Sequence, residues 1–99
     1  MKSEIKKLET EVREWAEELG VKPKEIQVAP LENKWGSCSS TGILTFSNEL
    51  LNKSKDFRAN IIVHELLHLR YRDHNKIFNL LWQAYLNKKG ISLSDEWRI

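Results

Sequence analysis

Two histidines four residues apart, His64 and His68, lie in a stretch whose apolar residues follow helical spacing. Residues separated by four positions lie one turn apart on the same face of an α-helix, so a helix here brings both imidazole rings toward one point. Glu65 is rotated by about 100° from His64 around the helix and lies beside that point. The pattern predicts a long helix over about residues 55–72 that carries a chemical site.

Residues 64–68 form an HExxH pattern, in which two histidines hold a zinc ion and the glutamate is a general base. A catalytic zinc usually has three protein ligands, so a third one is needed. The next predicted helix has no Asp or Glu between positions 75 and 90, and His74 is the natural candidate if the chain bends at residues 72–75. We predict a zinc site formed by His64, His68 and His74, with Glu65 activating a metal-bound water to hydrolyse a peptide bond.

Alternatives stay open for these side chains. All three histidines of the chain lie between positions 64 and 74, which suits one shared ion. His64 and His68 could instead be core histidines with satisfied hydrogen bonds, and His74 a surface helix cap. Cys38 is either a metal-directed thiolate or, as a lone half-buried cysteine usually is, a small packing residue.

The rest of the sequence predicts a single α+β domain over residues 1–99. Apolar residues at helical spacing indicate an N-terminal helix that ends at Gly20. Packing of this helix on the domain's own core is favoured over a coiled-coil seam for a partner. Alternation at 26–30 and a turn-rich join between 35–38 and 43–46 predict a small antiparallel sheet of about three strands.

A third helix is expected from about Asn75 to the Lys-Lys-Gly sequence at 88–90. It is apolar around much of its circumference, so we expect it to be largely buried. An extended C-terminal tail follows it. The free edge of the predicted hairpin would offer main-chain hydrogen bonds to an extended peptide beside the site.

Composition bounds the class of protein. The chain has 99 residues, of which 40% are hydrophobic and 30% charged, so there is room for one small core. No apolar run approaches the roughly 18 residues of a transmembrane helix, and the start lacks a signal-peptide pattern. We therefore expect no membrane insertion and a cytoplasmic location, with which the single cysteine is compatible. The net charge of +2 is interspersed, which does not indicate nucleic-acid binding, and we expect a monomer that acts on a peptide or protein.

Several segments form a recognisable combination: WGSCS at 35–39, HELLHL at 64–69, and the single positions Gly42, Asn48, His74 and Phe78. The combination resembles the minigluzincins, minimal soluble zincin metallopeptidases that are similar to YgjP-like proteins and to catalytic domains of membrane metallopeptidases. The resemblance covers roughly residues 26–86. It implies a gluzincin-like zinc hydrolase, with a histidine where most gluzincins use a glutamate ligand. Its implied ligands and base are His64, His68, His74 and Glu65.

The resemblance also implies that such proteins can be latent zymogens, in which a segment after the third helix blocks the cleft. Residues 91–99 are the candidate inhibitory tail, because they alternate in part and carry the only carboxylates after Asp73. We hypothesise that the tail lies extended along the sheet edge, with Asp95 or Glu96 approaching the zinc and Trp97 docked on the domain. The alternative is a frayed C-terminus.

Two rival functions are consistent with the sequence. A SprT-like, nucleic-acid-associated protease also couples HExxH with a nearby third histidine, and a basic patch on the folded protein would favour it. A non-catalytic, zinc-stabilised interaction module would use the stripe of the first helix, and its metal site would be closed to water.

Overall fold

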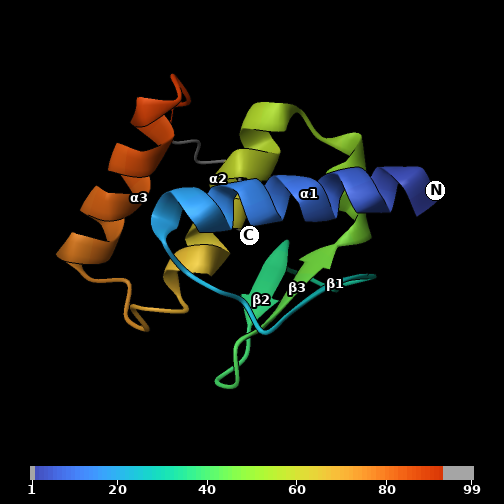
Figure 1. Ribbon diagram of the computed structural model, residues 1–99, viewed down its shortest axis with the longest axis horizontal. Coiled ribbons are helices and arrows are strands. Elements are labelled where there is room, and N and C mark those ends of the chain that lie inside the picture. The colour runs from blue at the N-terminus through green and yellow to red at the C-terminus, as the bar shows by residue number, and fades with distance from the viewer. Residues whose placement is uncertain (1, 93–99) are drawn as a thin grey trace.

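Three α-helices, one short 3₁₀ helix and three strands are formed by residues 2–92, the part of the chain described by the structure, which is a computed structural model. In chain order they are α1 (Lys2–Leu19), β1 (Glu25–Ala29), β2 (Gly36–Cys38), β3 (Ile43–Ser47), η1 (Asn48–Asn52), α2 (Lys55–Leu67) and α3 (Lys76–Lys88). α1 crosses α2, α3 lies beside α2, and the sheet lies below the helices in the view of Figure 1. The predicted α+β class is confirmed.

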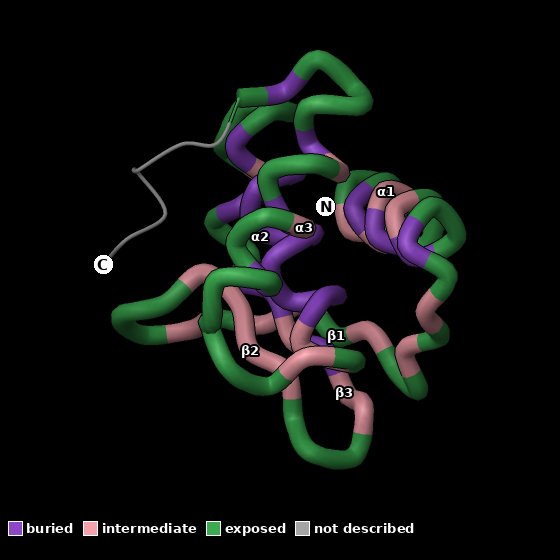
Figure 2. The backbone as a smooth tube through the Cα atoms, turned by 90° about the vertical axis from the view of Figure 1, so that its left-hand side faces the viewer, coloured by how far each residue is buried: buried purple, intermediate pink, exposed green. Residues whose placement is uncertain are grey.

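α2 is the central element of the fold. It contacts α1, α3 and β2, and every residue at positions 59–67 is buried. Figure 2 shows these buried segments gathered at the middle of the molecule. The helix begins after Ser54, whose hydroxyl oxygen accepts the N–H of Phe57 at 3.1 Å as an N-cap. Because α2 is enclosed on several sides, the polar side chains on it lie in a largely dry environment.

The predicted C-terminal end of this helix, near residue 72, is wrong. α2 ends at Leu67, and the N–H groups of His68, Leu69 and Arg70 each bond a carbonyl three residues back rather than four. This tighter turn breaks the α-helical ladder and changes the direction of the chain. The apolar pattern continued past Leu67, because Leu69 and Tyr71 pack against the core from a non-helical segment.

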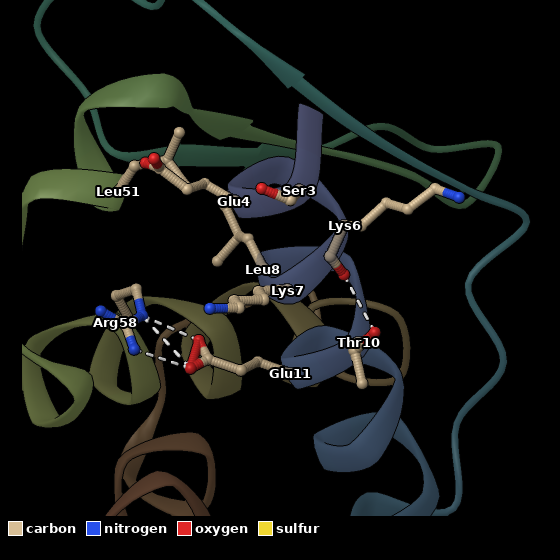
Figure 3. Close-up of a pocket in the computed structure, with 9 residues that line it drawn as sticks. All are labelled: Ser3, Glu4, Lys6, Lys7, Leu8, Thr10, Glu11, Leu51 and Arg58. Carbon is tan, nitrogen blue, oxygen red and sulfur yellow. Dashed lines mark hydrogen bonds and ion pairs between the residues drawn. The ribbon is translucent and has the colours of Figure 1, made fainter. Parts of the chain in front are cut away.

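α1 packs against the core through Leu8, Val12, Ala16 and Leu19, as predicted from its helical spacing. It ends at Gly20, which adopts a φ of +70° that few other residues tolerate. An ion pair fastens α1 to α2: Nε and Nη2 of Arg58 each donate to a carboxylate oxygen of Glu11 at 2.8 Å. Figure 3 shows this pair at one wall of a hollow of about 510 Å³ beside α1.

The sheet has three strands, as predicted, but it is mixed rather than antiparallel. Its order is β1-β3-β2, with β2 antiparallel and β1 parallel to β3. After β1 the chain crosses to the other edge of the sheet and forms β2 there. The hairpin between β2 and β3 then places β3 in the middle of the sheet, between β1 and β2. Two reversals of direction leave β3 running the same way as β1. As a result β2 is an edge strand, and it contacts α2.

α3 begins after Asn75, whose side-chain oxygen accepts the N–H of Phe78 at 2.9 Å. The expectation that this helix is largely buried is wrong. Its buried residues are Phe78, Trp82 and Leu86, whereas Ile77 and Leu80 are 59% and 57% exposed. The reason is that one flank of α3 meets α2, so part of the apolar surface has no neighbour within the described residues. None of the helices within residues 2–92 is long and apolar enough to span a bilayer.

Candidate metal centre

The structure brings the three predicted histidines together. His64 lies in the last turn of α2, His68 lies one residue beyond the helix, and His74 lies in the connection just before α3. Their ligand atoms all lie within 4.8 Å of one another. Nε2 of His68 is 2.8 Å from Nε2 of His74. The chain therefore bends between the two helices, as predicted for His74 as the third ligand.

Local hydrogen bonds produce this bend. After the tight turn at the end of α2, the N–H of Tyr71 bonds the carbonyl of Leu67 at 2.8 Å. A few residues later Asn75 caps α3, which restarts the chain in a new direction. Only three residues separate the bonded N–H of Tyr71 from the Asn75 cap, so this short connection holds His74 against the end of α2.

The ring of His68 has a defined tautomer. Its Nδ1 lies 3.1 Å from the carbonyl oxygen of Tyr71, and a carbonyl oxygen only accepts, so Nδ1 carries the proton. Nε2 of His68 consequently presents a lone pair toward His74. Metal-binding histidines are commonly oriented by such a bond from the second ring nitrogen.

Burial favours the neutral form of these rings. It lowers the pKa of His68, against an opposing effect of the Glu65 charge, and the His64 ring lowers it further. The pKa of His74 is lowered by burial and then by His64. An unprotonated imidazole is the form that coordinates a metal. Both rings are thus disposed to bind a cation rather than to carry a proton.

An aromatic wall supports the histidine rings from one side. The ring of Phe78 lies 5.4, 4.8 and 4.9 Å from the rings of His64, His68 and His74, measured between centroids. Trp82, one turn further along α3, lies 4.8 Å from His64. Sequence reasoning singled out Phe78 through the family resemblance alone and missed Trp82, although their i, i+4 spacing on an apolar helix was the available signal.

Glu65 lies between His64 and the edge strand. Its Oε2 is 2.9 Å from Nδ1 of His64, and both residues are buried, at 7% and 8% exposed. On the opposite side, Gly36 of β2 faces the Glu65 side chain. A hollow of about 170 Å³ opens here, lined by Trp35, Gly36, Ile61, His64 and Glu65 together with Asn33 and Lys34. The predicted base thus lies beside the histidine cluster and borders a cavity.

Cys38 does not join the metal-ligand group among the described residues. It is half-buried, packs against the core, and its pKa is raised by burial and then by the charge of Glu65. These properties agree with the interpretation of Cys38 as a packing residue. Asp95, Glu96 and Trp97, which were predicted to form the inhibitory tail contact, lie outside the described residues.

Comparison with known proteins identifies the class. Residues 1–89 match the YgjP-like, metallopeptidase domain. The chain belongs to this family and is a minimal zincin-like metallopeptidase, which confirms the resemblance noted in the sequence. Among proteins with curated descriptions, none matches the chain.

A solved structure shares the fold. It is the crystal structure of the metallopeptidase zymogen of Pyrococcus abyssi abylysin, with a TM-score of 0.67 and 22% sequence identity. The similarity covers 77% of this chain and 76% of the other. At this level of identity the likeness shows a shared fold.

Proposed function

We propose that the protein is a zinc endopeptidase in which His64, His68 and His74 hold the metal and Glu65 is the general base. The observation that carries the proposal is the convergence of three imidazole nitrogens within 4.8 Å, directly beside a buried carboxylate. His64 and Glu65 come from α2, His68 is the residue directly after this helix, and His74 comes from the connection to α3. Membership of a metallopeptidase family supports the same chemistry.

The donor set fits zinc. Three neutral imidazoles are a ligand set known for catalytic zinc, with the fourth position left for water or substrate. Ligand nitrogens around a tetrahedral zinc lie about 3.3 Å apart. The Nε2 atoms of His68 and His74 are 2.8 Å apart and all the ligand atoms lie within 4.8 Å of one another, so zinc would require these two rings to separate slightly and the more distant ligand atoms to move closer. The aromatic wall behind them keeps that side of the centre dry.

Zinc in this centre would lower the pKa of a water molecule to about 7 and polarise a substrate carbonyl. The contribution of the protein's own side chains is proton transfer by Glu65. Glu65 accepts a proton from the attacking water and delivers it to the departing amine. The bond to Nδ1 of His64 holds the Glu65 carboxylate in position for both transfers. Proton transfer by a positioned group of this kind typically contributes about 10²–10⁴ in rate.

The substrate in this proposal is an extended peptide that lies along β2. An edge strand has unpaired backbone groups, and a peptide added to it gains main-chain hydrogen bonds. β2 is the edge strand beside α2, and its residue Gly36 borders the hollow in which Glu65 lies. A peptide in that place brings its carbonyl groups to the histidine cluster.

Metal analysis and peptide cleavage test the proposal together. The wild-type protein is expected to contain zinc and to cleave peptides, and Glu65→Gln is expected to keep zinc while losing about 10²–10⁴ of the turnover. His74→Ala is expected to lose zinc, whereas Asp73→Ala, in the same connection, keeps it. Cleavage by a zinc-loaded Glu65→Gln protein, or unchanged zinc in His74→Ala, contradicts the assignment. Zinc without any turnover, both in the full chain and after removal of residues 93–99, would instead indicate an interaction module.

Latency through the C-terminal tail is part of the proposal. Ile91 is buried in the core, and the carbonyl of Ser92 accepts a hydrogen bond from Nδ2 of Asn60 at 3.2 Å. Asn60 lies one helical turn before His64 on the same face of α2. The tail thus starts from a fixed point near the metal centre. A structural relative is itself described as a zymogen.

Truncation after Ser92 tests latency, because this cut keeps Ile91 in the core. The shortened protein is expected to cleave peptides faster than the full chain, and Trp97→Ala is expected to give part of the increase. Equal rates before and after truncation would contradict latency and leave the assignment of the metal centre unchanged.

A cytoplasmic location also belongs to the proposal. It is supported by the free Cys38, which suits a reducing compartment.

A further inference from the structure

A second hollow borders the histidine cluster at the opposite end of β2. It has a volume of about 380 Å³ and reaches His68. Three segments form its walls: residues 20–22 after α1, residues 39–42 in the turn between β2 and β3, and residues 68–70 with Arg72 after α2. The hollow is separate from the one that Glu65 lines, and the histidine cluster lies between the two.

This hollow is positively charged. Lys22, Arg70 and Arg72 line it, and none of its lining residues is Asp or Glu. Within residues 2–92 none of these three cations forms an ion pair. Nη2 of Arg70 donates to the carbonyl of Gly20 at 2.8 Å, and Nη2 of Arg72 donates to the carbonyl of Ser40 at 3.3 Å. Both guanidinium groups are therefore bonded to uncharged backbone partners.

The same bonds hold the two arginines in place. Each guanidinium has five N–H donors, and a single hydrogen bond to a backbone carbonyl leaves most of them available for a ligand. The turn opposite contributes the hydroxyl groups of Ser39 and Thr41, whose oxygens lie 2.9 Å apart. A fixed guanidinium fork and nearby hydroxyl groups suit a carboxylate, which accepts hydrogen bonds through both oxygens.

The distance along the strand indicates which substrate residue reaches this hollow. β2 extends from Gly36, which borders the first hollow, to Cys38, which precedes the residues lining the second. A strand rises about 3.3 Å per residue, so a peptide along β2 passes from one hollow to the other within two to four residues. A side chain that close to the scissile bond contributes to selection of the substrate.

We propose that this basic hollow is a specificity subsite that binds an acidic side chain of the peptide substrate, a few residues from the scissile bond. The inference rests on the proposed peptidase function. A nucleic acid is the less suitable ligand, because its phosphates need an extended basic stripe rather than one small hollow. The terminal carboxylate of a peptide has the same chemistry as an acidic side chain, and the test separates the two.

The test is equilibrium binding to the zinc-loaded Glu65→Gln protein, which needs no turnover, and it uses both the full chain and the chain truncated after Ser92. Peptides carrying an uncharged fluorophore are compared, with either Glu or its isostere Gln at a position that is moved along the peptide. Each is made with a free and with an amidated C-terminus, which gives four peptides for each position. We expect the Glu peptides to bind about 10- to 100-fold more tightly than the Gln peptides, whatever the C-terminus, as for hydrogen bonds between charged groups. Added salt should reduce the difference.

Arg72→Gln in the same background is expected to abolish most of the preference for Glu. Lys34→Gln removes the same charge at the other hollow and should preserve it. Equal binding of the Glu and Gln peptides, or no binding of any peptide even to the chain truncated after Ser92, overturns the subsite. Tighter binding of the peptides with a free C-terminus, whether they carry Glu or Gln, overturns the assignment to an acidic side chain. If a single-stranded oligonucleotide displaces the labelled peptide more strongly than the unlabelled Glu peptide does, the assignment to a peptide ligand is overturned.

Wild-type cleavage of the same peptides separates this inference from the proposed function. Cleavage without a preference for Glu overturns the subsite and leaves the peptidase assignment intact. Selective binding of the Glu peptides with no cleavage, by the full chain or by the chain truncated after Ser92, overturns the peptidase assignment and leaves an acidic-peptide binding site.

Discussion

A Cβ atom on Gly36 would lie 2.9 Å from Cγ of Glu65, closer than non-bonded carbon atoms approach in proteins. It would also lie 3.3 Å from Cδ1 of Phe46. Phe46 is fully buried and Glu65 nearly so, which leaves little room for either side chain to retreat. The edge strand and the proposed general base are thus in direct contact, and this contact requires a residue without a side chain.

Gly36→Ala is therefore expected to displace the Glu65 carboxylate while leaving the histidines in place. Peptide cleavage should fall by up to about 100-fold, the order of loss that follows a displacement of about 1 Å in a catalytic group. Zinc content should not change. Ser37→Ala, whose side chain lies on the opposite face of the same strand, should keep full activity. Full activity in Gly36→Ala would show that Glu65 does not need its observed position.

Phe78→Leu is expected to weaken zinc binding about 10- to 100-fold, the usual effect of altering groups that support metal ligands. The leucine keeps the site apolar but removes the ring that lies against all three histidines. Zinc affinity would be measured by competition with a chelator, at a temperature at which the variant is folded. Leu86→Met, on the same buried stripe of α3, is the matched control. Equal zinc affinity in wild type and Phe78→Leu would assign the ring to packing alone.

The thiol of Cys38 reports the charge on Glu65. Burial raises the pKa of Cys38, the Glu65 carboxylate raises it further, and Arg72 lowers it. The thiolate is the reactive form, so Glu65→Gln should shift the pH profile of alkylation to lower pH and Arg72→Gln to higher pH. The rates would be measured on metal-free protein near pH 8, where the two variants should differ from wild type in opposite directions. Shifts in the same direction would mean that folding, not charge, controls the reactivity.

Asn60→Ala is expected to lower the free energy of unfolding by about 1–3 kcal/mol. The buried Asn60 amide donates to the carbonyl of Asp56 at 2.9 Å and to that of Ser92 at 3.2 Å. The variant removes these donors and leaves a small void in the core. Urea denaturation would measure the change, with Asn79→Ala on the exposed side of α3 as control. A loss no larger than that of the control would show that the bond to Ser92 contributes little.

Local signals in the sequence predicted much of this structure. Ser54 and Asn75 cap the helices that follow them, and Gly20 ends α1, because each of these residues acts on its immediate neighbours. The HExxH spacing and the absence of acidic residues in α3 pointed to His74 as the third member of the cluster. The structure brings it within ligand distance.

Features that depend on distant partners were not predictable in the same way. Leu69 and Tyr71 extend the apolar pattern beyond α2, although they pack from a turn, so the helix end was placed too late. The parallel pairing of β1 with β3 depends on which strand of the β2–β3 hairpin lies beside β1, and no local signal in the sequence determines that choice. Ile77 is exposed because α2 covers only one flank of α3. An apolar sequence pattern shows which faces of a helix are hydrophobic, but it does not show whether a neighbouring element covers each face.

The placement of the histidines at a junction between helices has a thermodynamic consequence. His68 follows the last residue of α2, and His74 precedes the cap of α3, so a cation shared by them would act as a cross-link between two helix ends. The chain has a single cysteine and therefore no internal disulfide to do this. Metal affinity and fold stability would then be two measures of one equilibrium, and any residue that stabilises the junction would also strengthen metal retention.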